Sequence, residues 1–469
     1  MALAAVLAVA ALTSLALPRP AAASHSQRMI FDAPRALHSD DPGLRADTLD
    51  QIKDLGAGWL RVVVAWHDVA PHPGRKHRPN FHEKDPGAYD WHVYDRIVSE
   101  ARARGLKILM TPSSPVPRWA TLGGRSTTRF PSATHFGRFV RALGEHYRHQ
   151  VGTWSIWNEP NLKHFLGPQF RGHKAYSPTL YRRLFLHAQK ALKASGNGHD
   201  RLLIGETAPR TRRGKSIGPL AFFRDMLCLD KHYKKRKHSH CKKIKADGFA
   251  HHPYTTHSGP YWIPRQRDDV SIGSLHRLTY ALYKAGKAHA LKKGAGLWIT
   301  EFGVQSKPDP YVGVSQQRQS EWRSIGEWIG YKIPRVKAFS QYLMRDDLPR
   351  EPGHGHAKYS GFESGLRTYK GHRKKAYKGF QLPLVADRRS KHSVRLWGLV
   401  RPAHGRVKVT LRYHNRHHKK WRKLKRVRTD RRGYFEARTR YHSGRQYLLS
   451  WKDGDGHRHS GSATRVTHD

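Results

Sequence analysis

Acidic residues are scarce in this chain of 469 residues. Only 35 Asp and Glu face 87 Lys and Arg, which gives a formal net charge of +52, so the protein will attract polyanions of any kind. The basic residues are spread along the chain and do not form one recognisable nucleic-acid module, so no specific nucleic-acid partner is predicted. A hydrophobic fraction of 38% with 13 Trp and 20 Tyr suffices for a globular core.

Cysteine is nearly absent. Cys228 and Cys241 are the only two, and in an exported chain they predict one disulfide, with two free thiols as the alternative. A zinc site in the basic loop between them is disfavoured by cation repulsion. No His-Glu-x-x-His motif accompanies the 34 histidines, and the sequence predicts no metal and no cofactor.

Long apolar runs are missing beyond the first residues of the chain. Residues 1–23 read as a signal peptide, because an apolar stretch from Met1 to Leu17 is followed by Pro18, Pro20 and an Ala21–Ala23 cleavage site. A membrane anchor at this position is the alternative. Cleavage would leave no membrane span, and the protein is then expected to be secreted or attached to the cell envelope, as a monomer.

Residues 24–384 alternate short β-type runs with longer amphipathic stretches, a pattern typical of βα units. The helical patterns cover Tyr89–Arg104, Ala133–His149, Thr179–Ala194, Leu275–Ala285 and Gln316–Ile329. Eight parallel strands closing on themselves form a (β/α)₈ TIM barrel. The eight β-type runs are Met29–Phe31, Trp59–Val64, Lys107–Thr111, Thr153–Trp157, Leu202–Gly205, Gly248–His251, Leu297–Thr300 and Ala338–Tyr342.

The character changes after about Leu384. Residues 385–469 alternate apolar and polar residues with turn signals and no helical pattern, which predicts a small all-β sandwich of the Ig-like kind. Between Arg388 and Asp469 there are 24 Lys and Arg but only 5 Asp and Glu. Two interpretations stay open, a solvated basic surface and adhesion to an anionic polymer of the cell envelope or extracellular space.

Two carboxylates stand out by position. Glu159 follows the fourth run in Trp157-Asn158-Glu159-Pro160, and Glu301 follows the seventh in Thr300-Glu301-Phe302-Gly303. Both fall at the carboxyl end of a predicted barrel strand, where catalytic groups of this fold gather. An acid after an apolar run costs burial energy unless it is paired or functional.

These motifs resemble clan A of the glycoside hydrolases, with families 5 and 39 as the nearest patterns. The resemblance implies cleavage of O-glycosidic bonds with retention of configuration, Glu159 serving as acid/base and Glu301 as nucleophile. It also implies an arginine that supports the nucleophile, Arg61, and an asparagine that binds the sugar 2-hydroxyl, Asn158. His252 and Tyr254 match a His-x-Tyr motif whose tyrosine contacts the nucleophile. Strand eight departs from family 5, which usually carries a tryptophan where Tyr342 or Gln341 would line the pocket here.

Further residues near strand ends are weaker candidates. Glu206, after the fifth run, would hydrogen-bond the substrate or orient His252. Trp66, Trp157 and Trp262 would stack on sugar rings, with ordinary core packing as an equal alternative.

Three functions are therefore distinguished. The leading hypothesis is a secreted retaining glycosidase acting on a β-linked saccharide or polysaccharide, and the second is a catalytically silent carbohydrate-binding barrel attached to anionic envelope polymers. The third, nucleic-acid binding, rests on charge alone and conflicts with export. Neither the sugar nor exo versus endo action follows from the sequence.

Overall fold

The computed structural model describes residues 27–237, 241–255, 258–402, 405–418 and 420–467. The predicted signal peptide lies outside these residues. No helix in the described part of the chain is long and apolar enough to cross a bilayer.

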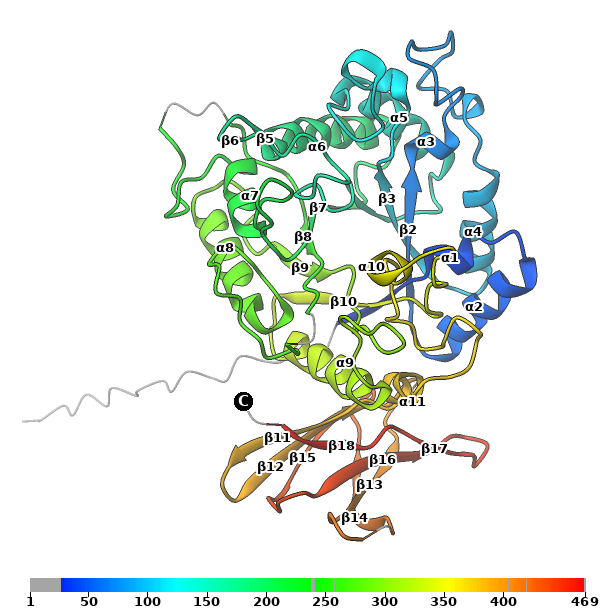
Figure 1. Ribbon diagram of the computed structural model, residues 1–469, viewed down its shortest axis with the longest axis vertical. Coiled ribbons are helices and arrows are strands. Elements are labelled where there is room, and N and C mark those ends of the chain that lie inside the picture. The colour runs from blue at the N-terminus through cyan, green and yellow to red at the C-terminus, as the bar shows by residue number, and fades with distance from the viewer. Residues whose placement is uncertain (1–26, 238–240, 256–257, 403–404, 419, 468–469) are drawn as a thin grey trace, which may run out of the picture.

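Eight parallel strands close into a barrel, as the sequence predicts. Each strand pairs with its neighbour along the chain, and β1 closes the ring against β10 (Figure 1). The strands are β1 (Arg28–Asp32), β2 (Trp59–Ala65), β3 (Lys107–Ser113), β4 (Thr153–Ser155), β7 (Arg201–Thr207), β8 (Gly248–His251), β9 (Gly296–Ile299) and β10 (Val336–Tyr342). A two-stranded hairpin, β5 (Phe170–Arg171) and β6 (Lys174–Ala175), extends the loop after β4.

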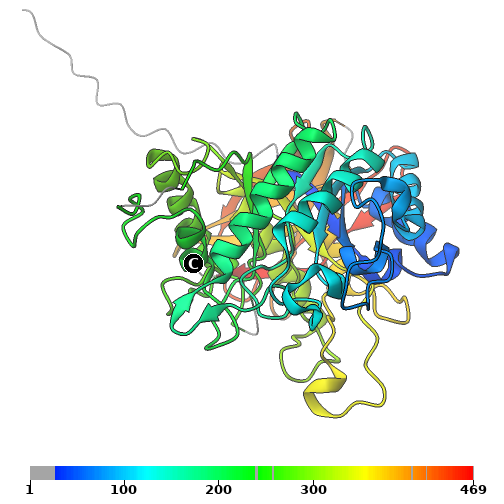
Figure 2. The ribbon, with the colours of Figure 1, turned by 90° about the horizontal axis from the view of Figure 1, so that it is seen from above.

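Helices surround this barrel (Figure 2). The five predicted helical segments all form, with ends that differ by a few residues from the predicted ones. The α-helices are α1 (Pro34–Leu37), α2 (Pro42–Asp54), α3 (Trp66–Val69), α4 (His92–Ala103), α5 (Ala133–His146), α6 (Ser177–Ala194), α7 (Pro219–Met226), α8 (Leu275–Lys287), α9 (Gln316–Tyr331), α10 (Gly355–Lys358) and α11 (Lys375–Gln381). Short 3₁₀ turns occupy Pro86–Ala88, Arg118–Ala120, Leu122–Gly124 and Ile272–Ser274.

Helix α5 illustrates why these segments are helical. Ser132 caps its start by accepting a hydrogen bond from the backbone N–H of His135 at 3.3 Å. Phe136, Phe139, Val140 and Leu143 follow with helical spacing and are all buried. This apolar stripe packs into the barrel's main core.

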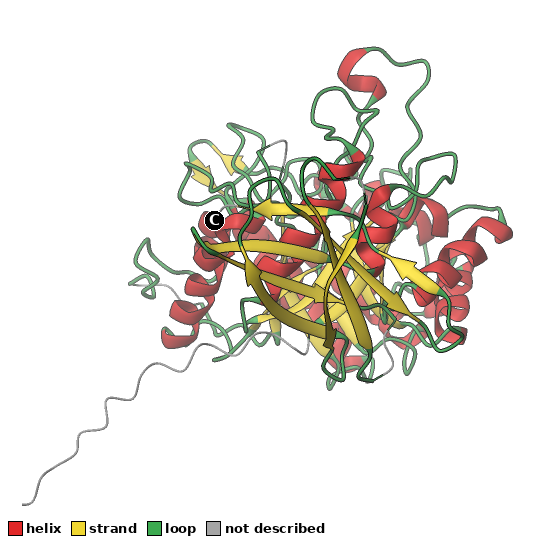
Figure 3. Cartoon of the chain, turned by 90° about the horizontal axis from the view of Figure 1, so that it is seen from below, coloured by secondary structure: helices red, strands yellow, loops and turns green. Residues whose placement is uncertain are grey.

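The C-terminal residues form a second, all-β unit, as predicted. Its strands follow the order β14-β13-β16-β18-β11-β12-β15, and β17 pairs with β16. Residues from both halves of this sheet share one core, so the sheet folds over itself as a sandwich (Figure 3). The strands are β11 (Leu384–Ser390), β12 (Ser393–Leu399), β13 (Lys408–His414), β14 (Arg422–Arg428), β15 (Tyr434–Arg440), β16 (Gln446–Lys452), β17 (Arg458–Ser460) and β18 (Thr464–Thr467).

Helices α9 and α11 lie between the barrel and the C-terminal sheet (Figure 1). Trp328 and Tyr331 of α9 pack against Trp397 and Tyr434 of the sheet. Beside them, Glu327 accepts hydrogen bonds from Arg323 and Arg401, and its side chain is fully buried. The interface is therefore an apolar contact around one buried ion-pair cluster.

The predicted disulfide joins Cys228 and Cys241, and no free cysteine remains. It closes the basic loop that follows α7.

Candidate active site

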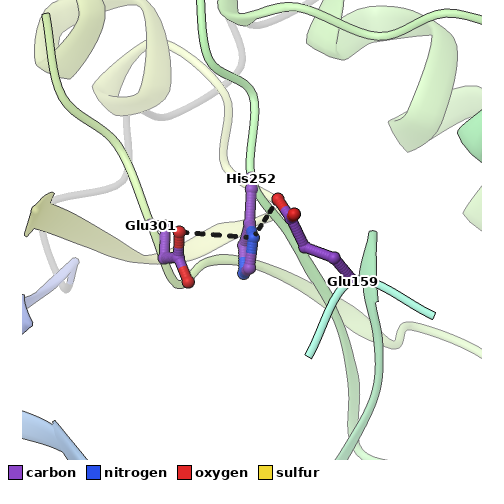
Figure 4. A group of neighbouring side chains, drawn as sticks. All are labelled: Glu159, His252 and Glu301. Carbon is purple, nitrogen blue, oxygen red and sulfur yellow. Dashed lines mark hydrogen bonds and ion pairs between the residues drawn. The ribbon is translucent and has the colours of Figure 1, made fainter. Parts of the chain in front are cut away.

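The carboxyl ends of three barrel strands, β4, β8 and β9, bring the predicted catalytic residues together. Glu159 follows β4, His252 and Tyr254 follow β8, and Glu301 follows β9. Figure 4 shows the side chains of Glu159, His252 and Glu301 converging from three separate segments, with the histidine between the two glutamates. The strand order of the barrel thus assembles residues that are far apart in the sequence.

Arg61, from β2, is the centre of the buried part of the site. Its Nη1 donates to Glu301 Oε1 at 2.6 Å and to Asp32 Oδ2 at 2.7 Å. Its Nη2 donates to Asn158 Oδ1 at 2.8 Å and to Glu206 Oε2 at 3.1 Å. One planar guanidinium therefore fixes the positions of three carboxylates and an amide, and the contact that the resemblance implies between Arg61 and Glu301 is present.

His252 connects the two glutamates. Its Nδ1 lies 3.0 Å from Glu159 Oε1 and 3.5 Å from Glu301 Oε2, while its Nε2 lies 2.5 Å from Glu206 Oε2. Burial lowers the pKa of the imidazole, but the surrounding carboxylates outweigh that effect and raise the pKa to about 10. His252 is thus a cation at neutral pH and donates hydrogen bonds from both ring nitrogens.

Glu206 is the carboxylate that holds this cation. Besides Arg61 and His252, it accepts hydrogen bonds from Ser155 Oγ at 2.5 Å and from Thr300 Oγ1 at 2.8 Å. Burial raises its pKa, but Arg61 and His252 outweigh burial and lower it to about 2. The contact with His252 that the sequence predicts for Glu206 is present.

Glu159 and Glu301 occupy environments of opposite kind. Burial raises the pKa of Glu159, and nearby Glu301 raises it further, although the hydrogen bond to His252 opposes both. Glu301 accepts hydrogen bonds from Arg61 and from Tyr254 Oη at 2.9 Å. One of these two neighbouring carboxyl groups, Glu159, is therefore biased toward its protonated form.

The two carboxyl groups are close. Single carboxylate oxygens of Glu159 and Glu301 and a ring nitrogen of His252 all lie within 4.8 Å of one another. Both glutamate side chains keep some contact with solvent, with exposed fractions of 14% for Glu159 and 10% for Glu301. Both carboxyl groups are thus in contact with solvent.

Backbone conformation at the strand ends helps to turn these side chains inward. Glu159 has φ of 42° and Glu206 has φ of 51°, in the left-handed region that non-glycine residues seldom occupy. The N–H of Glu159 also donates to the carbonyl of Glu206 at 2.9 Å. Strain of this kind persists where surrounding contacts hold it, and here they are the contacts of Arg61 and His252.

Three aromatic rings lie on the Glu301 side of the site. The ring of Tyr254 lies 6.1 Å from that of Tyr342 and 5.8 Å from that of Phe362, measured between centroids. Phe362 belongs to the long loop after β10, which carries α10 and projects beyond the barrel in Figure 2. Tyr342 thus occupies the strand-eight position beside Glu301, where the resemblance would place a tryptophan.

The three tryptophans predicted as possible sugar-stacking residues lie in two kinds of environment. Trp66 and Trp157 are fully buried, Trp66 stacked on Phe139 and Trp157 donating from Nε1 to the carbonyl of Phe165. These positions fit the packing alternative, because no ring face is open to a ligand. Trp262 is half-buried, and the guanidinium of Arg210 lies 4.4 Å from its ring centroid.

Asp32 was not predicted from the sequence. It stands at the carboxyl end of β1, and burial raises its pKa to about 7 against the effect of Arg61. The signal was present, because an acid directly after an apolar run is the same pattern that singles out Glu159 and Glu301. Ser155 and Thr300 gave no such signal, since hydroxyl side chains are common within strands.

The trio of Glu159, His252 and Glu301 has ligand-type atoms at distances that a metal ion could bridge. A ligating histidine must be neutral, with a free lone pair. His252, whose pKa the surrounding carboxylates raise to about 10, would have to release a proton to bind a metal ion. In this structure its two ring nitrogens lie in hydrogen-bond contact with Glu159 and Glu206.

No protein-family model and no curated protein matches the sequence. Among solved structures, the chain is similar to a glucosidase from Croceicoccus marinus, with 12% identity, 96% of this chain and 98% of that chain covered, and a TM-score of 0.54. It is also similar to a family 39 glycoside hydrolase from Bacteroides cellulosilyticus WH2, with 16% identity, 92% and 82% covered, and a TM-score of 0.52. At such identities the likeness concerns the fold, and the chain shares the TIM-barrel architecture of these two glycoside hydrolases.

Proposed function

We propose that this protein is a retaining glycoside hydrolase that cleaves a β-linked saccharide or polysaccharide. The observation that carries the proposal is the close approach of Glu159 and Glu301, within 4.8 Å between carboxylate oxygens. Retaining enzymes hold their two carboxyl groups about 5–5.5 Å apart, whereas inverting enzymes need about 6.5–9.5 Å to admit a water molecule. The two proteins of similar fold, a glucosidase and a family 39 glycoside hydrolase, support the same reaction class.

In the first step, Glu301 attacks the anomeric carbon and Glu159 donates its proton to the departing glycosidic oxygen. A covalent ester then joins the sugar to Glu301. In the second step, water attacks the same carbon, Glu159 takes a proton from that water, and the Glu301 carboxylate leaves.

The surrounding residues prepare these roles. Arg61 and Tyr254 orient Glu301 and stabilise it as an anion before attack and after departure. Asn158 is proposed to bind the sugar 2-hydroxyl, with its amide fixed by Arg61. His252 is a positioning residue, because it lies between the two glutamates and holds them at their working separation.

The test is covalent labelling with a panel of 2-fluoro glycosides, read by mass spectrometry of the peptide that contains Glu301. We expect a glycosyl adduct on Glu301 in the wild-type protein and none in Glu301→Gln. Glu159→Gln should lose most turnover of substrates with poor leaving groups and less with activated aryl glycosides, which need little protonation. If no probe labels Glu301 while glycans still bind, the barrel is the catalytically silent binder instead.

Export from the cell is a further part of the proposal. It is supported by the apolar N-terminal sequence and by the disulfide between Cys228 and Cys241. Cell fractionation of the producing organism, with the mass of the mature N-terminus, would test both cleavage and location.

A further inference from the structure

Residues 406–428 are the basic part of the C-terminal sheet. This stretch of 23 residues contains 11 Lys and Arg and no Asp or Glu. It comprises strands β13 and β14, and β14 is an edge strand because the sheet ends on it. Its exposed cations therefore lie on a strand that pairs with β13 along one side and forms the edge of the sheet along the other.

The pairing of the two strands gathers these cations on one face. In the antiparallel register, Lys408 lies opposite Arg428, Thr410 opposite Arg426 and Arg412 opposite Lys423. Val409 and Leu411, between them, point into the core and are buried. We call the five residues Lys408, Arg412, Lys423, Arg426 and Arg428 the basic face.

The basic face lacks counter-charges. Within the part of the chain that the structure describes, none of its five side chains forms an ion pair with a carboxylate. Like charges directly opposite each other destabilise an antiparallel pair, and this face has two such pairs. A bound polyanion would remove that repulsion and release its own counterions.

The basic face is also accessible. Lys408, Lys423, Arg426 and Arg428 are exposed. In Figure 1, β14 lies at the end of the molecule farthest from the barrel, so a long polymer can lie along it without meeting the barrel.

We propose that the basic face binds an acidic polysaccharide and thereby holds the barrel close to glycan. The choice of polymer rests on the proposed function, since a glycosidase gains from a surface that raises the local concentration of glycan. Alternate residues of a strand recur about every 6.6–6.8 Å, which presents cations as a linear row. Single-stranded nucleic-acid binders place several aromatic rings along such a row. Residues 406–428 contain two aromatic residues, Trp421 and Tyr413, and Tyr413 packs against the core of the C-terminal unit.

The test uses the full chain and polygalacturonate immobilised on a sensor surface. The variant Lys423→Glu/Arg426→Glu/Arg428→Glu changes the basic face, and Arg183→Glu/Lys190→Glu/Lys193→Glu makes the same change of charge on exposed positions of α6. We expect the first variant to lose at least about tenfold in affinity for polygalacturonate and the second less than about twofold. Each variant is measured at both about 50 mM and about 200 mM salt. The first variant should keep or raise its melting temperature, because Glu opposite Lys408 and Arg412 turns repulsion into attraction.

Equal losses in the two triple variants would overturn the proposal, because binding would then follow total charge. The proposal would also be overturned if the protein bound duplex DNA more tightly than polygalacturonate and if that binding depended on the basic face. The basic face would then be a nucleic-acid surface. Retained binding in the first variant would mean that the charges only protect the edge strand from aggregation.

Turnover of a soluble aryl glycoside separates this inference from the proposed function. The basic-face variant should keep it, and Glu301→Gln should lose it while still binding the polymer. If the protein turns over no glycoside but its binding of polygalacturonate still depends on the basic face, the proposed enzymatic function is contradicted. The inference that the basic face binds the polymer would then still stand.

Discussion

At the scale of single residues, the site is a set of buried charges that depend on one another. Arg61 and His252 are the cations, and Asp32, Glu159, Glu206 and Glu301 are the acids around them. Removing any one of these residues leaves its partners buried without the opposite charge that compensates their desolvation. The same residues that position the proposed nucleophile therefore also determine the stability of the barrel's carboxyl end.

Arg61→Met tests this dependence. We expect a loss of about 3–5 kcal/mol in the free energy of unfolding near neutral pH, because three carboxylates lose their cation. Glu206 has a lowered pKa, about 2 against 4.5, so its stabilisation is present above pH 4.5 and is lost as pH falls toward 2. The difference between wild type and variant in urea unfolding should accordingly shrink on acidification. A difference that stays constant down to pH 2 would contradict the coupling.

His252 gives a pH dependence of opposite direction. Its pKa is raised from 6.5 to about 10, so its stabilisation is complete below pH 6.5 and is lost as pH rises through 10. The melting temperature of the wild type should fall more steeply over that range than that of His252→Gln, which does not titrate. Parallel curves for the two proteins would show that His252 is not held as a cation.

At the scale of elements, close strand contacts position the carboxylates. Gly205 precedes Glu206 in β7 and has φ of +120°, and a Cβ there would lie 2.6 Å from the carbonyl oxygen of Ala250 in β8. A side chain at this position would push β7 away from β8 and move Glu206 with it. The position of Glu206 in the site thus depends on the absence of a Cβ atom at Gly205.

Gly205→Ala should cost about 2–5 kcal/mol, combining an unfavourable backbone conformation with overlap against backbone. Gly152→Ala is the matched control, because a Cβ there meets nothing within 4 Å, and it should change stability by less than about 0.5 kcal/mol. Denaturant unfolding of both variants measures the difference. Similar values for the two glycines would mean that the β7–β8 contact is easily relieved.

At the scale of the whole molecule, the barrel and the C-terminal sheet share a buried interface. Glu327 of α9 neutralises Arg323 and Arg401, one from the same helix and one from the C-terminal unit. Around these charges, Trp328, Tyr331, Trp397 and Tyr434 exclude water. We therefore expect the two units to unfold together.

Glu327→Ala should destabilise the protein by about 3–5 kcal/mol, because two guanidinium groups are left buried without an anion. Calorimetry should then resolve two transitions where the wild type has one. Asp40→Ala is the control, because Asp40 is fully exposed and pairs with a partly exposed Arg96, and it should stay within about 0.5 kcal/mol. A single unshifted transition in Glu327→Ala would mean that the aromatic contacts alone hold the units together.

Much of this architecture could be predicted from the sequence, because its signals are local. Apolar runs alternate with amphipathic stretches in the barrel, and all eight predicted strands form. In the C-terminal unit the sequence predicts strands over Val394–Leu399, Val407–Tyr413, Gly433–Thr439 and Gln446–Trp451, and it does not predict β11, β14, β17 and β18. The exposed β14 carries Lys and Arg at most positions, so it lacks the alternation by which a strand is recognised.

The sequence by itself determined the barrel, its all-β extension and the strand-end positions of Glu159 and Glu301, since each depends on periodicity within short segments. Only the tertiary structure decided which charges meet. That Arg61 reaches Asp32, that Glu206 contacts His252, and that Trp66 and Trp157 are enclosed depends on packing between strands distant in the chain. The physical reason is that a pKa, a burial or a hydrogen bond belongs to an environment, and the environment comes from the whole fold.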